Sequence, residues 1–131
     1  MAFGTELVLK IPFGTEVFVD GFFGFSQRFP LPSNVITFLD QVNQKKVLKI
    51  SIDLPTGISE GLESTFFNAD IVCTLAVPKK LLFQKKYSPR IFLIDLGIPE
   101  QAYRNFRKDL YLPFQNDTIV EIHLTGDLLL E

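Results

Sequence analysis

Three aspartates stand where carboxylates can do chemistry. Asp20, Asp53 and Asp95 each close a short apolar run and precede a turn containing Gly or Pro, in VD-GFFG, ID-LPTG and ID-LGIP. A fourth apolar run leads into AVPKK, which adds Lys79. Carboxylates beside ammonium groups can hold a metal, exchange a proton with a substrate or accompany a bound phosphate. Aspartate before Gly or Pro is also ordinary turn chemistry, but its recurrence after three such runs favours a site.

The apolar runs that carry these residues predict strands. Their mostly unbroken hydrophobicity is typical of strands buried on both faces of a parallel sheet. Ligands of open α/β sheets bind beyond the carboxyl ends of the strands, so the aspartates are expected on one rim. The predicted strands cover Glu16–Asp20, Val47–Asp53, Ile71–Ala76 and Arg90–Asp95.

A helix is predicted between the first two strands. Apolar residues recur at helical spacing within Ser33–Gln44, and Ser33 follows a proline as the expected N-cap. Strand, helix and strand then form a βαβ unit. A second, weaker helix is predicted over Gln101–Leu110, and Thr118–Leu124 alternates like a half-exposed edge strand.

Composition limits the class of protein. The 131 residues are 47% hydrophobic, which fits one α/β domain over residues 1–131. A formal charge of -2 with scattered basic residues disfavours nucleic-acid binding. Cys73 is the only cysteine, which excludes an internal disulfide and a Cys-based zinc cluster. The sequence shows no targeting peptide and no membrane-spanning run, so a cytoplasmic protein is expected, with a mitochondrial location as the alternative.

Four strings give the chain a family resemblance. FVDGFFGFSQRFPLP, SIDLPTG, NADIVCTLAVPKK and IFLIDLGIP follow one another between about Glu16 and Pro99. In order and spacing they resemble the second part of the YjeF N-terminal family, whose best-known members are NAD(P)H-hydrate epimerases. The resemblance implies a three-layer α/β sandwich with a mostly parallel, Rossmann-like sheet. It also implies an isomerase that interconverts the R and S forms of hydrated NADH or NADPH, so that a separate repair dehydratase can use the S form.

The resemblance also implies roles for individual residues. Asp20 would ligate a potassium ion, and Thr56, where the family usually has Ser, would offer its hydroxyl to the same ion. Asp53 would contact the altered nicotinamide and act as acid and base, since inverting a carbon that bears a hydroxyl needs proton transfer. Lys79 would neutralise substrate charge or assist that transfer, unless it is simply a solvated rim residue. The segment that would wrap the dinucleotide comprises Gly24, Phe25, Ser26, Gln27, Arg28, Phe29 and Pro30.

One family feature has no counterpart in this sequence. Family members begin with a helical segment and a strand that leads into a Gly/Asn-rich loop, usually GNNGGDG, which supplies a potassium-binding Asn and much of the phosphate cradle. This departure leaves two interpretations, a truncated or split gene product or a chain that has lost the activity. In either case, elements that would cover part of the sheet are missing from the sequence, which predicts an exposed apolar face that is prone to association.

Two functions from different classes therefore remain. The first is NAD(P)H-hydrate epimerase, which the retained Asp20, Gly24, Asp53 and Lys79 favour. The second is a non-catalytic binding or dimerisation module, which the missing loop favours, with a homodimer as one arrangement. The same fold serves as a scaffold in a messenger-RNA decapping factor and as an apolipoprotein-binding protein, so fold does not decide between the two.

Overall fold

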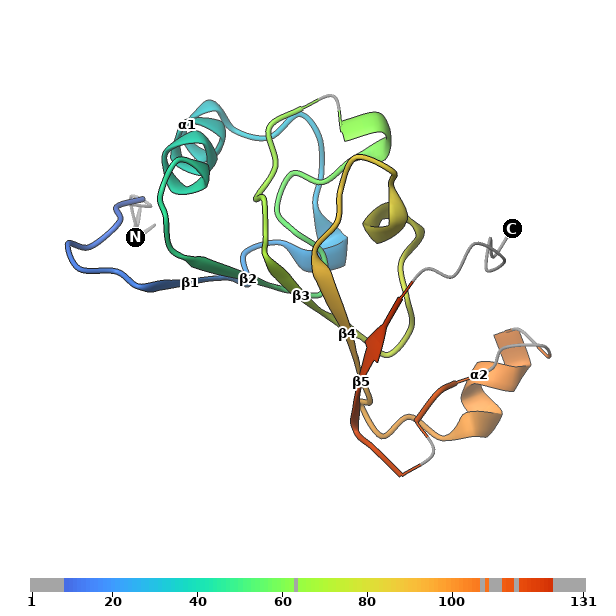
Figure 1. Cartoon of the computed structure of the whole chain (residues 1–131). Helices are drawn as coiled ribbons and strands as arrows, with labels where there is room; N and C mark the ends of the chain where they lie inside the picture. Colours follow the sequence, from blue (N-terminus) through green and yellow to red (C-terminus); the bar gives the residue numbers. More distant parts are fainter. Residues whose placement is uncertain (1–8, 63, 107, 109–111, 115, 124–131) are drawn as a thin grey trace, which may run out of the picture.

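A five-stranded sheet is the framework of the computed structural model, which describes residues 9–62, 64–106, 108, 112–114 and 116–123 (Figure 1). The strands lie side by side in chain order. The first four pair in parallel and the fifth is antiparallel. They are β1 Val17–Asp20, β2 Leu48–Ile52, β3 Ile71–Leu75, β4 Arg90–Ile94 and β5 Ile119–Ile122. The expected α/β fold with a mostly parallel sheet is confirmed, and each predicted strand is found with slightly narrower bounds; Leu124, the predicted end of the last strand, lies outside the described residues.

The helix α1 (Ser33–Asn43) connects β1 to β2 and covers one face of the sheet (Figure 1). Its buried side chains are Val35, Leu39 and Val42. The prediction that Ser33 caps the helix is wrong, because Pro32 is the N-cap and its carbonyl accepts the amide protons of Val35 and Ile36. Proline suits this place, since the first amides of a helix have no intrahelical acceptor and a missing N–H costs nothing there.

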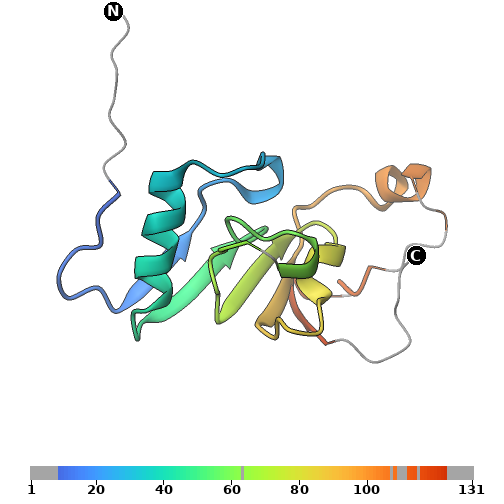
Figure 2. The same cartoon turned by 90° about the horizontal axis from the view of Figure 1, so that it is seen from above.

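The later connections contain shorter helices. Between β2 and β3 lies the 3-10 turn η2 (Glu60–Leu62), and between β3 and β4 lies η3 (Lys80–Phe83). The second predicted helix is found as α2 (Glu100–Phe106), beyond the β4–β5 end of the sheet and away from α1 (Figures 1 and 2). Residues 107, 109 and 110 of that prediction lie outside the described residues. Within the described residues, no helix has both the length and the apolarity needed to cross a bilayer.

The hydrophobic core lies between the sheet and α1. Phe67 is fully buried there, and its ring centroid is 5.6 Å from that of Phe18 on β1. Phe18 also contacts Phe38 of α1, with 5.7 Å between the ring centroids. Such aromatic contacts add to the roughly 25 cal/mol per Å² gained by burying apolar surface. Through these contacts, β1, α1 and the segment after β2 pack against one another.

The opposite face of the sheet is apolar and open. Phe18 points toward α1, whereas Val17 and Val19 are 49% and 57% exposed on the other side. The residues paired with Val17 and Val19 on β2, and their partners on the next strands, lie on this same face of the sheet. No described segment lies below β1–β3 in Figure 1. The prediction of strands buried on both faces is therefore wrong for the described chain, and the prediction that an apolar face of the sheet is left uncovered agrees with the structure. Further residues of this open face are Leu48, Ile50, Ile52, Ile71, Cys73, Leu75, Phe92, Ile94 and Ile119.

A lysine on the open face is expected to reduce nonspecific association. Leu48→Lys places a charge where the side chain is 42% exposed, and the lysine stem can still cover neighbouring apolar atoms. Binding of an apolar dye and light scattering should both fall, while the midpoint of urea unfolding changes little. Gln41→Lys adds the same charge to exposed α1 surface and serves as the control. Equal effects of the two variants would show that net charge, and not the open face, governs association.

The thiol of Cys73 on the open face is expected to react slowly in the folded protein. Burial raises the pKa of this thiol, so less thiolate, the reactive form, is present near pH 8 than for a free cysteine. Unfolding restores the ordinary pKa, and stability should therefore fall as the pH rises above about 8.5, where the unfolded thiol ionises. Iodoacetamide labelling at pH 8 with and without urea measures this difference. A native rate equal to the unfolded rate would contradict it.

Candidate functional site

The candidate site lies where β2 and β3 end. The residue after β2 is Asp53, with φ 69°, and the residue after β3 is Ala76, with φ 63°. Residues other than glycine adopt the left-handed region at a cost in free energy, and such residues often cluster at functional sites. The backbone amide of Asp53 donates to the carbonyl of Cys73 at 2.9 Å, so the turn is fixed directly onto the neighbouring strand.

An ion pair between Asp53 and Lys79 is the main feature of this site. Lys79 Nζ lies 2.5 Å from Asp53 Oδ1, and each side chain is only 15% exposed. Lys79 Nζ also donates to the carbonyl of Leu75, at the last residue of β3. Removing two charges from water costs free energy that their attraction often fails to recover, so a largely buried pair is weak as a purely stabilising device. The structure thus brings together Asp53, predicted as the acid–base group, and Lys79, predicted to neutralise substrate charge or assist the proton transfer.

The segment Gly24–Pro30 folds against this pair. Its first residues form the 3-10 turn η1 (Gly24–Ser26), the blue turn near the ends of β2 and β3 in Figure 1. Gly24 has φ 54°, and a Cβ there would lie 3.4 Å from Asp53 Oδ2, so the backbone of the loop lies close to the carboxylate. Phe25 and Phe29 are 75% and 49% exposed. The loop therefore presents aromatic surface to solvent beside Asp53; its remaining exposed members are Ser26, Arg28 and Pro30.

The side-chain amide of Gln27 forms hydrogen bonds with the protein's own backbone. Its Nε2 donates to the carbonyls of Gly24 at 3.2 Å and Pro55 at 3.3 Å. Its Oε1 accepts the amide proton of Gly57 at 2.7 Å. The bonds with Pro55 and Gly57 join the loop to the turn that follows Asp53.

Asp20, predicted as a cation ligand, is buried among hydrogen-bond donors. Oδ1 accepts from the hydroxyl of Thr56 at 2.7 Å, and Oδ2 accepts from the backbone amide of Thr56 at 2.7 Å. Ser51 Oγ lies 3.5 Å from Oδ2, and the amide of Phe22 donates to Oδ1 at 3.2 Å. Carboxylate and hydroxyl oxygens suit a hard cation, so the donor set fits potassium if Thr56 turns its hydroxyl proton away from Asp20. No cluster of three or more His, Cys, Asp or Glu side chains occurs among the described residues.

Asp95 does not join the site residues. It follows β4, and its Oδ1 accepts the amide proton of Gly97 at 2.8 Å within its own turn. For this aspartate the interpretation as ordinary turn chemistry agrees with the structure. Because β1 to β4 are parallel, Asp95 lies on the same rim as Asp20 and Asp53, as expected, and its hydrogen bond to Gly97 belongs to its own turn.

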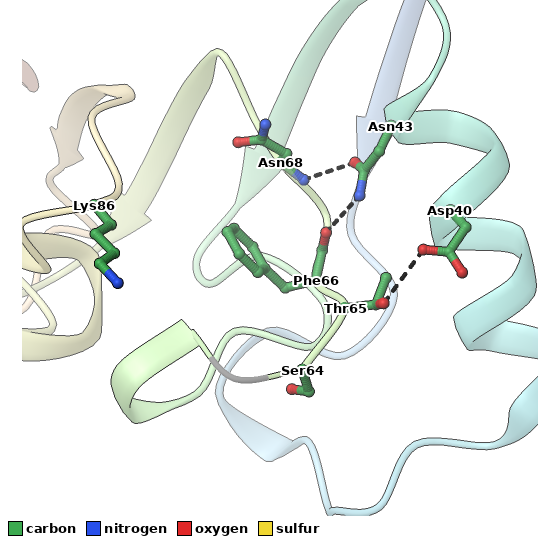
Figure 3. Close-up of a pocket in the computed structure, with 7 residues that line it drawn as sticks. All are labelled: Asp40, Asn43, Ser64, Thr65, Phe66, Asn68 and Lys86. Carbon is green, nitrogen blue, oxygen red and sulfur yellow. Dashed lines mark hydrogen bonds between the residues drawn. The ribbon is translucent and has the colours of Figure 1, made fainter.

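A polar hollow of about 320 Å³ lies elsewhere, beside the end of α1 (Figure 3). Its bonds are structural: Asn43 Nδ2 donates to the carbonyl of Phe66, and the hydroxyl of Thr65 donates to Asp40. None of the predicted site residues lines it. The remaining lining residues are Ser64, Asn68 and Lys86. We therefore assign it to the packing of the segment after η2 against α1.

Sequence patterns did not identify two residues that shape the site. Ser51 is fully buried beside Asp20, and the signal was a hydroxyl in the middle of an apolar strand. Gly57 is also buried, and a Cβ there would lie 2.5 Å from the carbonyl oxygen of Thr65. No local pattern revealed this contact, because it depends on how the segment after η2 folds back.

A large part of this chain is similar in sequence to known proteins. The family described as "YjeF-related protein N-terminus" matches residues 4–81, starting and ending earlier than the resemblance over Glu16–Pro99. A protein of Rhodopirellula baltica named NAD(P)H-hydrate epimerase is 29% identical over 99 residues, covering 70% of this chain and 40% of that protein. One of the same name from Weissella koreensis is 33% identical over 92 residues, covering 66% of this chain and 42% of that protein. The chain thus spans about two fifths of the length of these relatives.

A solved structure supports the fold. The crystal structure of the yeast protein ynu0 (YNL200c) is similar with a TM-score of 0.64 and 23% sequence identity. The similarity covers 82% of this chain and 47% of the yeast chain. At this identity the likeness establishes the architecture alone. The family match over more than half of the residues shows that the chain belongs to the YjeF N-terminal family.

Proposed function

We propose that this chain carries the active-site pair of an NAD(P)H-hydrate epimerase. The observation that carries the proposal is the ion pair of Asp53 and Lys79, held beneath the Gly24–Pro30 loop. Both charges are largely buried and Asp53 has a left-handed backbone, a combination that is costly to maintain for stability alone. The names of the two bacterial relatives support the same reaction.

In the proposed reaction the protein donates one proton to the substrate and later recovers it. The bond between the ring carbon and its hydroxyl breaks with the electron pair on oxygen, and one proton from the pair converts that oxygen to water. The lone pair of the ring nitrogen stabilises the cation left behind. Water then adds to the other face and gives one proton back, so no electron or proton is consumed. The pair holds this proton as the Lys79 ammonium; in this proposal Asp53 faces the oxygen, passes the proton from Lys79 to it, and returns it to Lys79 when water adds.

The loop and the buried Asp20 have supporting roles in the proposal. The Gly24–Pro30 segment would lie along the dinucleotide, with Phe25 and Phe29 available for stacking because both are exposed. Asp20 and Thr56 would hold potassium, which would supply positive charge near the substrate phosphates.

A non-catalytic module is the second candidate. The observation that favours it is the open face of the sheet, since apolar surface of this extent usually marks an interaction site. A homodimer formed through that face is one such arrangement. This candidate predicts association without turnover, whereas the epimerase predicts turnover that depends on Asp53.

The test is an epimerisation assay on the purified, folded chain. R-NADPH hydrate is supplied with potassium and with a dehydratase that accepts only the S form, so dehydration reports conversion. Conversion well above the spontaneous rate supports the epimerase. A folded chain without conversion contradicts the proposal for this chain and leaves the binding module as the better account.

A further inference from the structure

The side-chain amide of Gln27 connects two backbone segments that border Asp53. It donates to the carbonyl of Gly24 within the loop, and its bonds with Pro55 and Gly57 join the loop to the turn at Pro55–Gly57. Only a primary amide offers donors and an acceptor on one planar group, so neither a carboxylate nor an ammonium can reproduce the set.

The segments joined by Gln27 are the ones that enclose Asp53. Gly24, which accepts one of its bonds, lies so near Asp53 that a Cβ on it would meet the carboxylate at 3.4 Å. Pro55, which accepts another, lies two residues after Asp53. Releasing Gln27 would therefore free the loop from the turn while leaving the Asp53–Lys79 pair in place.

We infer that Gln27 is a positioning residue that holds the Gly24–Pro30 loop closed over Asp53. It acts through the loop and does not itself contact the substrate. For the effect on the substrate, the inference rests on the proposed function; the closure of the loop does not depend on it.

A second glutamine provides a matched comparison. Gln84 Nε2 donates to the carbonyls of Ser59 at 2.8 Å and Leu81 at 3.0 Å, and its Oε1 accepts the amide proton of Gly61 at 2.7 Å. The chemistry equals that of Gln27, but the bonds join η3 to η2. Replacing Gln84 therefore removes the same number and kind of hydrogen bonds without releasing the Gly24–Pro30 loop.

Hydrogen exchange on the full chain tests the closure directly. In Gln27→Ala, the amides of Gly57 and of residues 24–29 should exchange roughly tenfold faster or more, since both side-chain hydrogen bonds between Gln27 and the turn are lost. In Gln84→Ala, the amide of Gly61 should exchange faster while residues 24–29 keep the wild-type rate. Gln27→Glu, which keeps only the acceptor for Gly57, should protect Gly57 but leave residues 24–29 unprotected.

Kinetics on the same variants test the consequence for the substrate. Gln27→Ala should raise the KM for R-NADPH hydrate about tenfold and lower kcat by less than threefold, because the reacting pair is unchanged; Gln84→Ala should alter neither. Unchanged exchange of residues 24–29 in Gln27→Ala, or equal acceleration in Gln84→Ala, would overturn the inference. If the wild type shows no turnover, the proposed function fails, and the exchange rates still decide whether Gln27 closes the loop.

Discussion

Replacing Asp53 by asparagine is expected to lower kcat for epimerisation of NADPH hydrate by about 10² to 10⁴-fold, the usual contribution of a positioned acid–base group. Asparagine is the appropriate replacement because it keeps the size of the side chain and tolerates the left-handed backbone at φ 69°. Asp53→Ala would add backbone strain and confuse the result. The measurement is the rate of the dehydratase-coupled assay, with circular dichroism to verify the fold.

The ion pair makes a second variant necessary. Asp53→Asn leaves the ammonium of Lys79, only 15% exposed, without its carboxylate partner, and that lowers stability. The double variant Asp53→Asn/Lys79→Met removes both charges and should recover much of the stability but none of the activity. A single variant that is folded and retains wild-type kcat would rule out Asp53 as the acid–base group.

Of the substitutions proposed for this protein, Gly57→Ala is expected to lower the free energy of unfolding most, by about 3 kcal/mol or more. The free energy of unfolding of a typical domain is about 5–15 kcal/mol. Its φ of 86° costs an alanine about 1–2 kcal/mol. The new Cβ would also lie 2.5 Å from the carbonyl oxygen of Thr65 and 2.9 Å from the Cα of Phe66. These are backbone atoms, so the clash cannot be relieved by changing a rotamer and the segment itself must move.

Gly14→Ala is the control for backbone conformation. Gly14 has φ 79°, close to that of Gly57, but nothing lies within 4 Å of a Cβ placed there. Its replacement should therefore cost only the conformational part, about 1–2 kcal/mol. Urea unfolding of both variants measures the difference in free energy. Equal losses would show that the segment at Thr65 and Phe66 yields to the methyl group without cost.

Individual residues show why only part of the site was predictable. Asp53 and Lys79 were identified from their places after apolar runs, since residues that end parallel strands share one edge of the sheet. Gln27 was assigned to substrate binding, whereas its amide is bonded to a turn 30 residues further along the chain. Asp95 was indistinguishable from Asp53 in the sequence, because a local turn and a site both place aspartate before Gly or Pro.

The sequence by itself determined the strands, α1 and the edge that carries the candidate site, because hydrophobic periodicity encodes which local segments are buried. Only the tertiary structure decided which face of the sheet stays open and which polar groups meet. Asp20 is hydrogen-bonded to Thr56, 36 residues further along the chain, because the turn after β2 folds over the strand ends. Such pairings depend on left-handed turns and packed segments far apart in the chain, and no local pattern specifies them.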